Sequence, residues 1–143
     1  MQSHLEALSS VLQIDALQLD ATGLRSLWID RSVVVHLQAD AARQEWVLFA
    51  VVGSLPPQPS PAVLMRLLRA NRFGRGTAGA TLSLDEQTPA QVILGRRVSW
   101  TSLTEAQFVA IFESFVDHAR HWKSAVEAPV EQEVSRLVVG QMA

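Results

Sequence analysis

The sequence predicts an α+β fold, a twisted antiparallel sheet flanked by helices in the order α-β-β-β-α-β-β-α. Three observations favour this class. Apolar residues recur at three- and four-residue spacing in three segments, and strand-like apolar runs lie between those segments. The chain has 143 residues, 48% hydrophobic and 18% charged, which is enough for one domain with a packed core.

The first half of the chain predicts one helix and three strands. A short helix opens it, with an apolar face formed by Leu5, Leu8, Val11 and Leu12. Two strands follow at residues 24–30 and 33–40, joined by a tight turn at Asp30 and Arg31. A third strand spans residues 45–55 (EWVLFAVVGSL) and is apolar on both alternating sides. We therefore expect it to be covered on both faces or to be buried in a subunit contact.

The segment PPQPSP then interrupts the chain and predicts the start of a second helix. Ser60 is a suitable N-cap and Pro61 a suitable first helical residue. The apolar stripe of this helix consists of Val63, Leu64, Leu67 and Leu68. A strand follows at residues 80–85 (ATLSLD), where alternation predicts that Ala80, Leu82 and Leu84 face inward. Residues 91–100 (QVILGRRVSW) form its hairpin partner.

The last predicted helix is the strongest element. Thr104 and Gln107 match a capping box. One helical face then carries Phe108, Ile111, Phe112, Phe115, Ala119 and Trp122. We place the domain at residues 1–126 and a C-terminal tail at 127–143. In that tail a short amphipathic helix is compatible with the spacing of Val130, Val134, Leu137 and Val138.

Composition excludes several functional classes. The net charge of −2 argues against a general polyanion binder. The absence of cysteine excludes disulfides, thiolate metal sites and a cysteine nucleophile. The N-terminus has no pattern of a secretory signal, and the longest apolar run, Trp46 to Gly53, is too short to span a bilayer. We expect a cytoplasmic protein without a membrane partner.

The segment RFGRGTAGATL contains Gly74-x-Gly76-x-x-Gly79, which has the spacing of a dinucleotide-binding fingerprint. That fingerprint requires a strand before the loop and a helix after it, whereas here a helix precedes the loop and a strand follows. No helix N-terminus is available for a pyrophosphate. We instead expect Gly74 and Gly76 to adopt left-handed conformations, and Gly79 to permit close backbone approach.

No other pattern indicates catalysis or a cofactor. His118 and His121 are three residues apart beside Asp117, but zinc needs at least three protein ligands, so a polar helix face is the simpler interpretation. No nucleophile–base pair or paired carboxylate is evident, and we expect no enzyme activity. Arg66, Arg69, Arg72 and Arg75 form a basic stripe that could contact phosphates or complement a helix dipole. Arg96 and Arg97 could extend it or pair with Asp85 and Glu86.

Large apolar side chains are abundant for so small a sheet. Trp28, Trp46 and the run Val47 to Val52 must be covered by only three helices. Surplus apolar surface on a small acidic domain indicates protein–protein contact. The alternative, that the helices cover all of it, is equally compatible with the composition.

Three segments resemble the Tir-chaperone (CesT-like) family, the class I chaperones of type III secretion. They are LLRANRFGRGTAGATLSLDE, VILGRRV and LTEAQFVAIFESFVDHARHW. The family's Ala-Asn-x-Phe segment and its Gly-Thr-x-Gly-Ala-x-Leu strand match Ala70, Asn71, Phe73, Gly76, Thr77, Gly79, Ala80 and Leu82. We expect these motif positions to have structural roles. The upstream segments LWIDRSVVVHLQAD and EWVLFAVVGSLP also look like the family's first three strands. Gly74, where many members have a bulky residue, and the tail after Glu127 depart from the pattern.

The resemblance implies a cytoplasmic bacterial homodimer, associated with virulence, that binds the N-terminal chaperone-binding segment of a secreted effector. It implies no cofactor and no catalysis, and it adds the secretion ATPase as a further partner. It places the dimer contact at Leu64, Leu67 and Leu68, and effector grooves at Leu5, Leu8, Leu12 and Trp28. Each of these leucines could equally be ordinary core. The alternative function is a small regulatory or nucleic-acid-binding protein that uses the stripe from Arg66 to Arg75.

Overall fold

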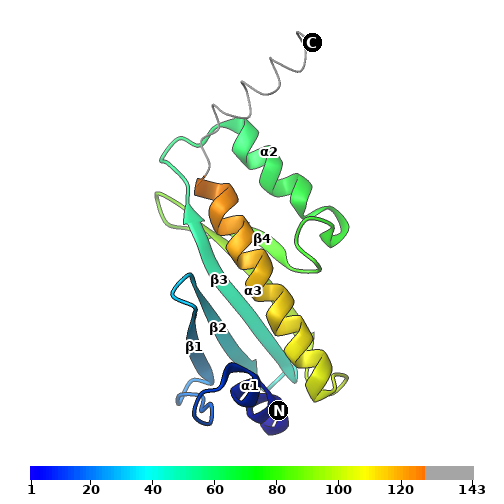
Figure 1. Cartoon of the computed structure of the whole chain (residues 1–143). Coiled ribbons are helices and arrows are strands. Elements are labelled where there is room, and N and C mark those ends of the chain that lie inside the picture. Colours follow the sequence, from blue (N-terminus) through cyan, green and yellow to red (C-terminus); the bar gives the residue numbers. More distant parts are fainter. Residues whose placement is uncertain (128–143) are drawn as a thin grey trace.

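The computed structural model describes residues 1–127 and confirms the α+β class (Figure 1). The element order agrees with the prediction, with one additional 3₁₀ turn after the second helix. The elements are α1 (Gln2–Leu12), β1 (Leu24–Ile29), β2 (Val33–Asp40), β3 (Glu45–Ser54), α2 (Pro61–Ala70), η1 (Arg72–Gly74), β4 (Thr81–Leu84), β5 (Gln91–Ser99) and α3 (Glu105–Glu127). Apart from Glu127, where α3 ends, the predicted tail lies outside the described residues.

The sheet has five strands in the order β1-β2-β3-β5-β4, and every neighbouring pair is antiparallel. The turn between β1 and β2 is the predicted one. Asp30 and Arg31 have φ values of 48° and 56° and are the central residues of a β-turn, which the Ser32 amide closes by donating to the Ile29 carbonyl at 2.9 Å. The strand order leaves β1 and β4 as the two edges of the sheet.

The helices form a layer on one face of this sheet, and α3 runs along β3 (Figure 1). Alternate residues of the strands point to this layer and are buried, including Val35, Leu37, Leu48 and Leu94. They meet the predicted apolar face of α3, of which Phe108, Phe112, Phe115, Ala119 and Trp122 are buried and Ile111 is half-buried. The core therefore lies between one side of the sheet and α3.

The predicted capping signals position two of the helices. Ser60 Oγ accepts a hydrogen bond from the Val63 amide at the start of α2. At the start of α3, the Thr104 amide donates to Gln107 Oε1 and the Gln107 amide donates to Thr104 Oγ1, at 2.9 and 3.1 Å. This is the reciprocal pairing of a capping box.

A buried histidine attaches α1 to the core. His4 Nδ1 accepts from Trp46 Nε1 at 3.2 Å, its Nε2 lies 2.9 Å from the Leu103 carbonyl oxygen, and its ring stacks on Phe108. Because the tryptophan can only donate, Nδ1 is unprotonated and Nε2 donates to the carbonyl. α1 packs beside α3, so Leu5 and Leu8 are core residues.

The glycine loop follows α2 and precedes β4, which is the order of elements on which the dinucleotide fingerprint was rejected. Gly74 has a positive φ of 67°, as expected. The roles of the other two glycines are reversed. Gly79 has a φ of 87°, whereas Gly76 is the point of close approach, where a Cβ would lie 2.9 Å from the Ala70 Cα. Trp122 Nε1 also donates to the Gly76 carbonyl at 3.0 Å, which connects the loop to α3.

Two expectations about strand faces need correction. Leu84 points to the same side of β4 as Leu82, as expected, but it is 45% exposed at the end of the edge strand. β3 was expected to be covered on both faces or to be buried in a subunit contact. Residues 1–127 bury only the side with Trp46, Leu48, Ala50 and Val52, so within the described part of the chain β3 is not covered on both faces.

Candidate protein-binding surfaces

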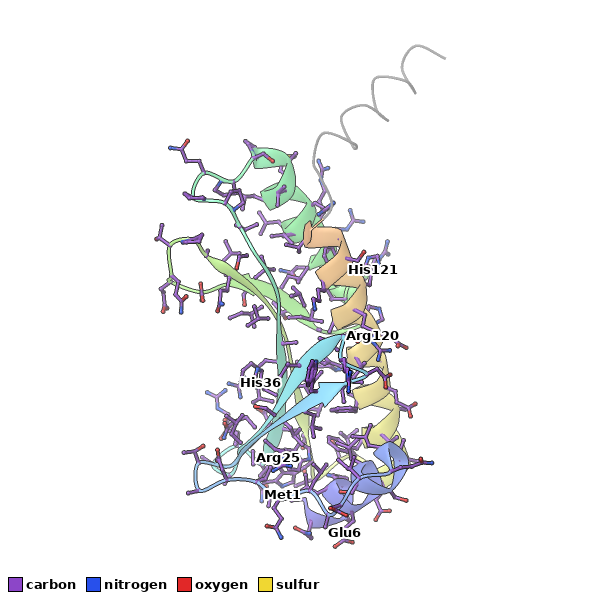
Figure 2. All side chains as sticks on the ribbon, turned by 60° about the vertical axis from the view of Figure 1, so that its left-hand side comes forward. Met1, Glu6, Arg25, His36, Arg120 and His121 are labelled. Atoms are coloured by element: carbon purple, nitrogen blue, oxygen red, sulfur yellow. The ribbon has the colours of Figure 1, made fainter. Side chains whose placement is uncertain are left out.

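The sheet face opposite α3 is open, and we call it the open face. Figure 2 shows that α3 covers one side of the strands and that His36 lies on the other. Apolar side chains of neighbouring strands project from this face, namely Trp28, Val34, Phe49, Val51 and Ile93. Trp28, Val34 and Val51 have exposed fractions of 68%, 41% and 40%. The helices among residues 1–127 therefore leave a contiguous apolar surface uncovered.

His36 lies in the middle of the open face. Its ring stacks on Phe49 with 4.6 Å between the ring centroids, and its Nδ1 lies 2.7 Å from Ser26 Oγ. Desolvation by burial lowers the pKa of His36 below its usual value. The face is therefore uncharged at its centre near neutral pH.

At one end of the open face, near the β1–β2 turn, the surface forms a hollow of about 340 Å³. We call it the Trp28 hollow. Its apolar wall consists of Trp28, Val33, Val34 and Val51, and its polar lining of Arg31, Ser32, His36 and Lys123. Lys123 Nζ donates to the Ser32 carbonyl at 2.7 Å, and this contact attaches the turn to α3.

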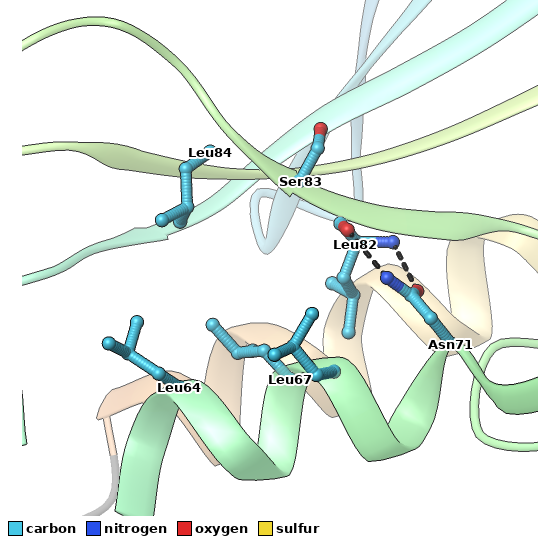
Figure 3. Close-up of a pocket in the computed structure, with 7 residues that line it drawn as sticks. Leu64, Leu67, Asn71, Leu82, Ser83 and Leu84 are labelled. Carbon is cyan, nitrogen blue, oxygen red and sulfur yellow. Dashed lines mark hydrogen bonds between the residues drawn. The ribbon is translucent and has the colours of Figure 1, made fainter. Parts of the chain in front are cut away.

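A second apolar surface lies between α2 and β4, and we call it the α2–β4 groove. Leu64 and Leu67 of α2 face Leu82 and Leu84 of β4 across it (Figure 3). Its volume is about 270 Å³. Asn71 closes one end, where Nδ2 donates to the Leu82 carbonyl and Oδ1 accepts from the Leu82 amide, both at 2.8 Å (Figure 3).

The structure separates the four residues expected in effector grooves. Leu5 and Leu8 are wrong for this role, because both are buried between α1 and α3 and present no surface to a partner. Leu12 is half-buried at the end of α1. Trp28 is highly exposed on the open face, and of the four it is the one that a partner could contact most fully.

The three residues expected at a dimer contact lie on α2. Leu68 is 71% exposed, Leu64 is half-buried, and Leu67 is buried in the core. Leu67 lines the floor of the α2–β4 groove but offers little surface of its own, and the dimer contact at these residues stays a prediction. Met65 and Leu84, which were not expected at a dimer contact, are exposed beside this surface. Alternation predicts the side to which Leu84 points, but not that residues 1–127 leave this end of β4 uncovered.

The motif residues are structural with one exception. Asn71 joins α2 to β4 as described, and buried Thr77 donates its hydroxyl proton to the Ala80 carbonyl. Gly76 and Gly79 allow the close approach and the positive φ that the loop between α2 and β4 requires. Phe73 is the exception, because its side chain is 88% exposed and its φ is 53°.

The basic stripe is interrupted. Arg66 is half-buried and its Nη2 donates to the Ala125 carbonyl, so it tethers α2 to the end of α3. Arg69, Arg72 and Arg75 remain exposed. On the hairpin, Arg97 pairs with Asp40 and Glu45 at 3.3 and 3.2 Å, and Arg96 donates to the Ala78 carbonyl. Neither forms the expected pair with Asp85 or Glu86.

No site for a metal is formed by residues 1–127, where no three histidine or acidic side chains gather closely enough to hold an ion. His118 Nδ1 lies 2.8 Å from the Ser114 carbonyl, which is a local helix contact. Within the same residues, no helix combines the length and apolar character needed to cross a membrane.

A family model described as Tir chaperone protein (CesT) family matches residues 3–123. The Chlamydia pneumoniae protein CPj0713/CpB0740 is 38% identical over 109 residues, covering 76% of this chain and 81% of that protein. The family model spans most of α1, the whole sheet and most of α3.

Solved structures with the same fold include complexes. A chain of the ExsC–ExsE complex has a TM-score of 0.69 and 25% identity, covering 86% of this chain and 90% of that one. The Yersinia pestis type III secretion chaperone SycH, solved with a stable fragment of YscM2, has a TM-score of 0.65 and 25% identity, with coverage of 82% and 95%. A chain of the HopA1–SchA chaperone–effector complex has a TM-score of 0.70, with coverage of 86% and 92%. At 21% identity it supports the fold alone.

Proposed function

The chain belongs to the Tir chaperone protein (CesT) family, and we propose that it is a non-enzymatic type III secretion chaperone. It binds the N-terminal chaperone-binding segment of an effector in the bacterial cytoplasm and keeps that segment soluble and competent for secretion. The observation that carries this proposal is the open face. An apolar surface with an exposed tryptophan at an edge strand suits a non-globular guest chain.

Physical chemistry supports an extended guest at this position. The outer edge of β1 can accept a strand through backbone hydrogen bonds, while apolar side chains of the guest pack on Trp28 and its neighbours. A guest that is ordered on binding loses conformational entropy, so the contact area must be large. The open face crosses four strands and offers such an area.

The chaperone is proposed to act as a homodimer through the α2–β4 groove, where Leu64, Leu68 and Leu84 would meet a second copy. Light scattering after size-exclusion chromatography should give about twice the 15.7 kDa chain mass. Leu68→Asp should shift the mass toward one chain, because a buried unpaired carboxylate is costly. A monomer in the wild type at micromolar concentration would contradict this part of the proposal. The secretion ATPase is a further proposed partner, at a later step of delivery.

Effector binding is tested by co-expressing the chain with candidate effectors encoded near its gene, followed by pull-down and protease mapping. We expect one candidate to be captured and its N-terminal segment to be protected. Trp28→Ala should weaken capture strongly. Arg25→Ala is the matched control, because Arg25 is exposed on the same strand but belongs to its other side. Capture that is equal in both variants would contradict the use of the open face.

The nucleic-acid alternative loses support, because Arg66 is engaged with Ala125 and does not belong to an exposed stripe. A gel assay at low salt would still reveal any binding to DNA or RNA.

A further inference from the structure

The Trp28 hollow combines apolar walls with two cationic side chains, and this combination restricts what can bind there. Arg31 lies in the β1–β2 turn at a φ of 56°, and Lys123 comes from the last turns of α3. Both line the same hollow as Trp28, Val34 and Val51. Two segments more than 90 positions apart in the chain therefore supply the two charges.

Neither cation is neutralised by residues 1–127. The nearby carboxylate of Asp30 accepts from Arg120 Nη2 at 2.8 Å, and Asp117 lies 3.9 Å from the same guanidinium. Those two carboxylates and Arg120 form their own cluster. Lys123 uses one of its three N–H donors on the Ser32 carbonyl, which leaves two available. Within the described chain, Arg31 and Lys123 form no ion pair, so this end of the open face is positive although the chain has a net charge of −2.

We propose that the Trp28 hollow selects guest segments that carry a large apolar side chain with an aspartate or glutamate a few residues away. This inference rests on the proposed function and specifies the chemistry of its partner. The apolar side chain packs against Trp28, Val34 and Val51 and displaces water from them. The carboxylate accepts hydrogen bonds from Arg31 and Lys123, which are charge-assisted and shorter than neutral ones. A guest with lysine or arginine at that position is rejected by like charge.

The hollow suits a peptide better than the other occupants that its charges could attract. A nucleic acid would match the cations but would leave the valine wall in contact with water. The volume of the Trp28 hollow is near the lower limit of small-ligand pockets, so the hollow fits a few side chains rather than a cofactor.

The test is selection of random phage-displayed peptides on the full chain, followed by binding measurements on the selected peptides by fluorescence polarisation. We expect enrichment of sequences with a large apolar residue close to aspartate or glutamate. The double variant Arg31→Gln, Lys123→Gln should weaken their binding about tenfold, from two exposed charge contacts. Lys123→Gln keeps a donor for the Ser32 carbonyl. Arg43→Gln, an exposed arginine in the β2–β3 turn, is the matched control and should not change binding.

The outcomes separate this inference from the proposed function. Selected peptides without acidic residues, the absence of any enriched peptide, or a double variant that binds like wild type would overturn the inference. An effect of the double variant on the mass of the assembly, without an effect on peptides, would overturn it by assigning the hollow to a second copy. The proposed function would survive each of these results if Trp28→Ala still reduced effector capture. It would fail separately if no co-expressed effector were held.

Discussion

Asn71 makes a sharp test of how α2 is held to the sheet. Its side-chain amide donates to and accepts from the backbone of Leu82, so it replaces a strand partner at the outer edge of β4. Asn71→Ala removes both bonds and leaves the Leu82 amide and carbonyl without their partner. The edge strand would then depend on β5 alone.

The expected cost follows from the two bonds. Each contributes a net ~0.5–1.5 kcal/mol, so the free energy of unfolding should fall by about 1–3 kcal/mol. For a domain of this size, a loss of ~2 kcal/mol lowers Tm by roughly 4–8 °C. Asn71→Asp should be no better than alanine at neutral pH. It keeps the acceptor for the Leu82 amide but places a carboxylate oxygen against the Leu82 carbonyl.

Urea unfolding followed by circular dichroism, at one protein concentration for all variants, gives the free energies. Ser83→Ala is the control, because Ser83 is an exposed neighbour on the same strand and should change stability by less than ~0.5 kcal/mol. The reasoning is refuted if Asn71→Ala also stays within that range, or if Asn71→Asp is as stable as wild type.

Three further predictions concern His4 in the core, Gly76 in the glycine loop and His36 on the open face. His4→Phe keeps the stacking but deprives the buried Trp46 N–H of its acceptor, so it should cost about 1–3 kcal/mol in urea unfolding; equal stability would refute the assigned tautomer. Gly76→Ala places a Cβ 2.9 Å from the backbone of α2 and should cost about 1–3 kcal/mol, whereas Gly95→Ala meets nothing closer than 3.8 Å and should be tolerated better. Because burial lowers the pKa of His36 in the folded protein, the unfolded chain protonates this residue at a higher pH than the folded chain does. Stability from this residue is complete above the unfolded pKa of about 6.5 and falls as the pH drops from there to the folded pKa. His36→Gln should flatten that part of a stability–pH curve, and an unchanged slope would count against it.

The element order was predictable because its signals are local. Ser60 and Thr104 satisfy nearby backbone groups, and the turn at Asp30 and Arg31 follows from strand length on either side. Alternation also placed Ala80 and Leu82 on the buried side of the short edge strand. These features depend on residues a few positions apart, and the chain satisfies them within each element.

The protein-binding surfaces were less predictable, because the exposure of a strand side chain depends on whether a layer of helices covers its face of the sheet. The continuous apolar character of β3 predicts burial, but whether a second layer exists is decided by the placement of α1 and α2. Leu5 and Leu8 were expected to line a groove but are core residues. His4 attaches their helix to Trp46 and Leu103, which are 42 and 99 positions away in the chain, and local sequence signals do not report such contacts. The glycine loop shows the same limit. Contact with Ala70, a non-local effect, decides that Gly76 is the tight position and Gly79 the left-handed one.

The attachment of α1 has a consequence for motion in the native state. The helix has no side-chain hydrogen bond at its N-cap and no acidic residue in its first turn. It is attached chiefly through buried Leu5 and Leu8, the hydrogen bonds of His4, and Ser9 Oγ, which accepts from the Leu17 amide. An element secured by so few groups can detach as a unit while the strands stay paired. Its amides should exchange with deuterium together and earlier than those of β3. Each such opening would briefly expose the rings of Phe108 and Trp46 to solvent. The domain therefore contains a second apolar surface that is buried in the native state and becomes accessible when α1 detaches.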